Sequence, residues 1–195
     1  MSFFDEAPAK NELGPNRSVR ESLPSWRYPP TETYLPSILP WTRILGRSSD
    51  GCIALEIVRC WPQGLSLDLD LFVNASSPLS DTVFHQHRLT HGESPSPGRF
   101  RAGVLYPDGR RAIDTLPDEG ISPKEGGNAD HLILLRQGSS GTHLRTRQTF
   151  YLSPLPPPGK FKLIVAWTDL GIPDTESELD GTEVLRLATH AMSVW

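Results

Sequence analysis

The stretch Leu65–Val73 reads LSLDLDLFV, and it decides the expected fold of this chain. Leucine or valine stands at every second position, with Ser66, Asp68 and Asp70 between them. A period of two is typical of an antiparallel strand that buries one face, so we expect these three polar side chains to form a solvated outer face. A pair of carboxylates for acid–base chemistry or calcium binding is the alternative use of Asp68 and Asp70.

The segment before this strand predicts its hairpin partner. Residues 52–61 read CIALEIVRCW, and the turn residues Pro62–Gly64 separate them from Leu65. Cys52 and Cys60 would lie roughly 26 Å apart along one strand, whereas a disulfide needs Cα atoms within ~7 Å. We therefore expect two small buried thiols on the same face of the strand. Three aliphatic residues are expected on one face of this strand: Ile53, Leu55 and Ile57.

Further apolar segments between proline- and glycine-rich turns predict more strands, at 82–89, 100–106, 110–115, 131–136, 147–152 and 160–168. Near the end of the chain, Val184, Leu187, Ala188 and Ala191 recur at spacings of three and four, which predicts a helix over 181–194. Acidic residues before it would suit the positive end of the helix dipole. The expected fold is mainly β, an antiparallel β-sandwich or open barrel with a C-terminal α-helix.

The length of 195 residues favours a single domain, which we place at 26–195. Residues 1–25 are polar and mixed in charge, and we expect them to form a disordered or loosely docked tail. Residues 26–46 combine prolines with tryptophan and tyrosine. Because free linkers are poor in aromatic residues, we expect an extended arm that buries these rings against the body.

Charge and hydropathy narrow the classes of partner. The net charge is −4, which argues against nucleic-acid binding. No run of about 18 apolar residues predicts a membrane span, and the first residues lack the apolar centre of a secretory signal. We therefore expect a cytoplasmic protein that binds neither nucleic acid nor a membrane.

The motifs that carry chemistry are sparse. The sequence holds no phosphate-binding loop, no dinucleotide fingerprint and no CxxC pair, so we expect no cofactor. The one dense histidine group is His85, His87 and His91. Two histidines on one face of a strand and a third from the next loop would suit a zinc site, and a metal-assisted hydrolase is therefore an alternative function.

Short motifs occur along the chain in one order: YPP at 28–30, RCWPQGL at 59–65, GVLY at 103–106, DGR at 108–110, LPPPG at 155–159 and GIPDT at 171–175. In this order the chain resembles a family of uncharacterised actinobacterial proteins of similar length, over residues 26–195. The resemblance implies a mainly-β domain with a C-terminal helix. It implies no activity and no catalytic residue.

Two segments of opposite charge favour a protein partner. No nucleophile–base pair or metal cage emerges, so we expect a non-catalytic interaction or scaffold module rather than an enzyme. A small-ligand binder that uses the mouth of the sandwich is a further alternative. The sequence leaves the oligomeric state open. The candidate partner-binding residues are basic between 88 and 111 and acidic between 176 and 180: Arg88, Arg99, Arg101, Arg110, Arg111, Glu176, Glu178 and Asp180.

Overall fold

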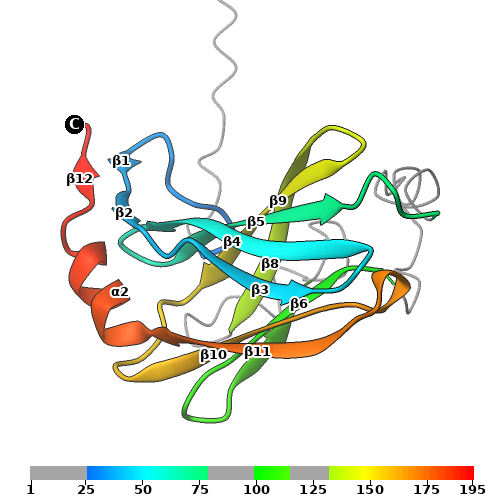
Figure 1. The fold of residues 1–195 in the computed structure, drawn as a ribbon. Helices are drawn as coiled ribbons and strands as arrows, with labels where there is room; N and C mark the ends of the chain where they lie inside the picture. Colours follow the sequence, from blue (N-terminus) through cyan, green and yellow to red (C-terminus); the bar gives the residue numbers. More distant parts are fainter. Residues whose placement is uncertain (1–25, 79–98, 115–131) are drawn as a thin grey trace, which may run out of the picture.

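A computed structural model describes residues 26–78, 99–114 and 132–195 of the chain. These residues form two larger antiparallel sheets packed face to face and a small two-stranded sheet, with one short α-helix near the C-terminus (Figure 1). The predicted mainly-β class is therefore confirmed. The predicted tail at 1–25 and strand at 82–89 lie outside the described residues. None of the described helices is long and apolar enough to cross a membrane.

The larger sheet has the strand order β2-β4-β5-β9-β8, and β3 also pairs with β4. The smaller sheet has the order β11-β10-β6-β7, and β1 pairs with β12 in a two-stranded sheet. The strands are β1 (Tyr34–Leu35), β2 (Ser37–Leu39), β3 (Arg43–Arg47), β4 (Gly51–Cys60), β5 (Leu65–Val73), β6 (Arg101–Leu105), β7 (Arg111–Ile113), β8 (Ile133–Gly141), β9 (Arg145–Ser153), β10 (Lys160–Trp167), β11 (Ile172–Asp180) and β12 (Met192–Ser193).

The core fills the space between the two sheets. Alternate residues of each strand point inward, as the period of two predicts. The leucines of β5 meet Phe161, Leu163 and Val165 of β10 in one continuous cluster. Trp167 is buried at its end and packs edge-to-face on Phe100, with ring centroids 6.3 Å apart. This core leaves each sheet with an outer face.

The hairpin of β4 and β5 has the predicted position, but β4 contains a β-bulge between Leu55 and Ile57. A bulge adds one residue and reverses which side chains point inward beyond it. Val58 and Cys60 are therefore buried, whereas Ile57 is only half-buried. The prediction that Ile57 shares the inward face with Leu55 was wrong for this reason. Cys52 and Cys60, both free thiols, likewise point to opposite faces.

The C-terminal region differs from the predicted helix over 181–194. Helix α2 covers only Gly181–Ala188, and its N-cap Asp180 accepts a hydrogen bond from the Thr182 amide at 2.9 Å. The chain then pairs with β1, and the Val194 amide donates to the Thr33 carbonyl oxygen. Backbone hydrogen bonds to a distant strand thus replace the expected last turns of the helix. The acidic segment before α2 is a strand, β11, and not a helix entry.

The proline-rich arm is extended, but it does more than lie on the body. Within 26–46 the chain forms β1 and β2 and most of β3, and β2 and β3 both pair with β4. The buried Leu39 and Leu45 belong to the core cluster. The arm is therefore part of the larger sheet.

Candidate interaction surface

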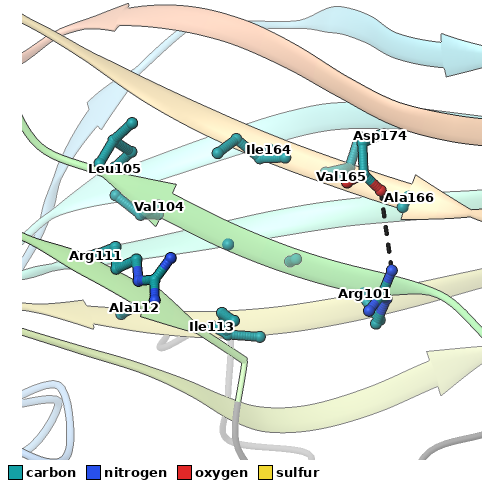
Figure 2. A pocket seen from close by; sticks show the side chains of 12 residues that line it. Arg101, Val104, Leu105, Arg111, Ala112, Ile113, Ile164, Val165, Ala166 and Asp174 are labelled. Carbon is teal, nitrogen blue, oxygen red and sulfur yellow. Dashed lines mark ion pairs between the residues drawn. The ribbon is translucent and has the colours of Figure 1, made fainter. Parts of the chain in front are cut away.

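The outer face of the smaller sheet brings together residues from both charged segments (Figure 2). The register aligns them in three cross-strand rows, because paired residues of neighbouring strands share a face. We call the outward residues of these rows the interaction face. The first row is Glu178, Lys162, Leu105 and Arg111; the second is Glu176, Ile164, Gly103 and Ile113; the third is the pair Ala166 and Arg101. The register of β10 with β11 shifts next to this third row, where Asp174 of β11 lies 3.9 Å from Arg101, and we count Asp174 with the interaction face.

A groove of about 350 Å³ lies in the middle of this face. It exists because Gly103 has no side chain, whereas its neighbours Ile164 and Ile113 do. A Cβ at position 103 would meet only the Ala112 carbonyl oxygen, at 3.3 Å. Ile113 is 63% exposed and presents an apolar side chain at the groove. The groove therefore has an apolar floor and wall.

The strand β11, which runs beside the groove, is acidic, and its Asp174 lines the groove. Asp174, Glu176 and Glu178 stand at every second position of β11, and lysines of β10 bind two of them. Lys162 Nζ donates to Glu176 at 2.6 Å, and Lys160 Nζ donates to Glu178 at 2.9 Å. These hydrogen bonds raise the pKa of both lysines and lower the pKa of Glu178. Lys160, Lys162 and Glu178 are therefore charged at neutral pH.

The opposite side of the groove is basic. Arg101 lies 3.9 Å from Asp174, a long contact between side chains that are 49% and 74% exposed. Such exposed pairs contribute little and are easily exchanged for another partner. Within the described part of the chain, Arg111 has no ion pair or side-chain hydrogen bond, and Figure 2 shows it at the rim of the groove. The basic side can therefore bind a carboxylate.

The remaining predicted partner residues are not part of the rows that make up the interaction face. Arg110 lies in the turn between β6 and β7, where it pairs with Asp108 at 2.7 Å and covers the ring of Tyr106. Arg99 is half-buried before β6. Asp180 caps helix α2. Arg88 lies outside the described residues. The face thus unites Arg101, Arg111, Glu176 and Glu178 of the predicted set.

The outer face of the larger sheet carries a second charged cluster, and it corrects the expectation of a solvated face. Asp68 and Asp70 are each only 2% exposed, and Ser66 is buried. Arginines from the neighbouring strands bind both carboxylates and the bulge residue Glu56. We call this cluster the ionic layer: Glu56, Arg59, Asp68, Asp70, Arg145 and Arg147.

Contacts in the ionic layer are dense. Asp68 accepts hydrogen bonds from Arg59 at 2.8 Å and from Thr149 at 2.9 Å. Asp70 accepts from Arg145 at 2.5 Å and from Arg147 at 3.2 Å. Three carboxylates face three guanidinium groups, so the layer is balanced in charge. Such an arrangement fits a structural role in joining β4, β5 and β9, not the proposed acid–base pair of Asp68 and Asp70.

The remaining candidates for catalysis are the Cys60 thiol, groups of metal-binding side chains and the histidine group. Burial, with a smaller contribution from the charge of Glu183, raises the pKa of the Cys60 thiol to about 11. This thiol is therefore protonated at neutral pH and is not a nucleophile. In the described residues, no group of three or more His, Cys, Asp or Glu side chains could hold a metal ion. His85, His87 and His91 lie outside the described residues, so the hydrolase hypothesis stays a prediction.

Comparisons with protein-family models, with curated proteins and with solved structures find no match to this chain. The resemblance to an actinobacterial family therefore stays a prediction from the sequence.

Proposed function

We propose that this chain is a non-catalytic protein-interaction or scaffold module that binds another polypeptide through the interaction face. The observation that carries this proposal is the apolar groove at Gly103, which has an acidic strand on one side and two arginines on the other. Protein interfaces combine an apolar centre with a polar rim in this way. The charged rim orients the partner, and the apolar centre supplies most of the binding free energy.

A polypeptide suits this surface better than a small molecule. Sites for small ligands are concave and enclose most of the ligand surface. The groove instead lies on the outside of a sheet, and the exposed Ile113 stands at its edge. A partner that spans several strands would cover Ile113 and the charged rows together.

Site-specific photo-crosslinking in the native cell tests this proposal. A photoreactive phenylalanine replaces Ile113, and the adducts are resolved by mass. The matched control carries the same group at Ile44, which is 51% exposed on β3 of the other sheet. We expect a discrete polypeptide adduct from position 113 and none from position 44.

A second variant connects the adduct to the groove. Gly103→Val fills the hollow with a side chain that strands favour. We expect the adduct from position 113 to disappear in this background while the circular dichroism spectrum stays that of the folded chain. The melting temperature should fall at most modestly, since the new Cβ would lie 3.3 Å from the Ala112 carbonyl oxygen. Equal labelling from positions 113 and 44, or an adduct that persists in the Gly103→Val background, would contradict the proposed function.

A further inference from the structure

We propose that the occupant of the interaction face is a second copy of this chain, in a two-fold symmetric dimer whose smaller sheets pack face to face. This inference rests on the proposed function, because it names the partner of the same surface. Three features of the face support it: the separation of charge across the strands, the position of the hollow, and the places of Arg111 and Glu178 in one row.

The charges of the face are divided by strand. The acids of β11 outnumber the lysines of β10 on one half, and Arg101 and Arg111 make the other half basic. A two-fold axis parallel to the strands, between β10 and β6, turns the acidic half of one copy onto the basic half of the other. A two-fold axis across the strands would instead oppose acids to acids. The separation of charge therefore selects one symmetric arrangement.

The same axis matches the shape of the two copies. Ile164 and Gly103 are direct cross-strand partners on β10 and β6, so they lie on either side of this axis. Rotation about it places Ile164 of each copy over Gly103 of the other. The aliphatic side chain then enters the hollow that the glycine leaves. This pairing buries apolar surface at the centre of the interface, where it contributes most.

The neighbouring row supplies the charged contact. Glu178 and Arg111 stand at its two ends, on the two outer strands of the sheet. Rotation exchanges the ends, so Arg111 of each copy lies opposite Glu178 of the other, twice in every dimer. Stacked sheets lie about 10 Å apart, a gap that long arginine and glutamate side chains can bridge.

The size of the face predicts a weak dimer. Four strands spaced by about 4.8 Å span less than 20 Å. The area buried would fall in the class of transient complexes, below about 1,200 Å² in total. We therefore expect monomers in dilute solution and dimers as the concentration rises.

Charge reversal tests this geometry by sedimentation equilibrium of the full chain from about 10 μM to about 1 mM, a range that suits weak interfaces. Arg111→Glu and Glu178→Arg each replace both attractive contacts by repulsive ones, and each variant alone should dimerise at least about tenfold more weakly. An equimolar mixture of the two should dimerise like the original chain, because both contacts are then complementary. The control Arg47→Glu makes the same charge change on β3 and should have no effect.

The outcomes separate this inference from the proposed function. A mixture that restores dimers which neither variant forms alone supports the two-fold arrangement. A chain that stays monomeric at about 1 mM overturns it, and so does a dimer that neither reversal weakens. If the chain is monomeric while position 113 still crosslinks to a polypeptide of different mass, the proposed function stands and the second copy is refuted. If position 113 also yields no adduct, both fail.

Discussion

The ionic layer makes a quantitative prediction about folding stability. Asp70 is 2% exposed, and Arg145 and Arg147 both donate to it. The substitution Asp70→Asn keeps the size of the side chain but removes its charge, which leaves the two guanidinium groups without one of the two carboxylates that they share. Removing one partner of a buried ion pair costs about 3–5 kcal/mol.

The expected cost here lies at the lower end of that range. Arg145 and Arg147 are 47% and 33% exposed, so water compensates part of the lost attraction, and Glu56 still binds both guanidinium groups. We expect a loss of about 3 kcal/mol in the free energy of unfolding. For a chain of this length that corresponds to a fall of about 6–12 °C in Tm.

Urea unfolding followed by circular dichroism measures this loss, with Asp174→Asn as the matched control. Asp174 is 74% exposed and lies 3.9 Å from Arg101, so its substitution should leave the midpoint unchanged. Equal midpoints for Asp70→Asn and Asp174→Asn would refute the reasoning. The ionic layer would then be an ordinary solvated surface that holds no strands together.

Two further predictions concern the backbone and alkaline pH. In Gly181→Ala the new Cβ would lie 2.2 Å from the Pro157 carbonyl oxygen, so we expect the free energy of unfolding in urea to fall by more than about 2 kcal/mol. The control is Gly138→Ala, whose new Cβ meets no atom within 4 Å, and it should be neutral or stabilising. For Cys60 the unfolded thiol ionises near pH 9 and the folded thiol near pH 11. The unfolding free energy should therefore fall as pH rises through this range, and Cys60→Ala should show a shallower fall in urea titrations; identical slopes would contradict the assigned pKa.

Periodicity in single strands predicted much of the fold. The alternation in Leu65–Val73 located β5 correctly, because leucine or valine at every second position places all of these side chains on one face of a strand. It did not predict what covers the other face. The arginines that bury Asp68 and Asp70 come from β4 and β9, up to about eighty positions away in the chain, and their approach depends on strand pairing that one strand's sequence does not encode.

One local signal was present but pointed to the wrong element, and two other features had no local signal at all. Acids at every second position of Ile172–Asp180 carry the period of a strand, yet the proximity of an amphipathic helix favoured a helix entry. The bulge at Glu56 has no signature in the sequence, because its position is set by the pairing of β4 with β5. The groove could not be predicted from any single segment either, because Gly103 leaves a hollow only when Ile164 and Ile113 flank it in the formed sheet.

The central claim is that the outer face of the smaller sheet is where this chain binds its partner, a second copy of itself. Isotope-filtered nuclear Overhauser spectroscopy tests it directly, in a mixed sample of one methyl-labelled, deuterated copy and one unlabelled copy. The account predicts an intermolecular contact between the Ile164 δ1 methyl group and the Gly103 α protons. Intermolecular contacts from Ile44 in place of Ile164, or none at concentrations where sedimentation shows dimers, would contradict it.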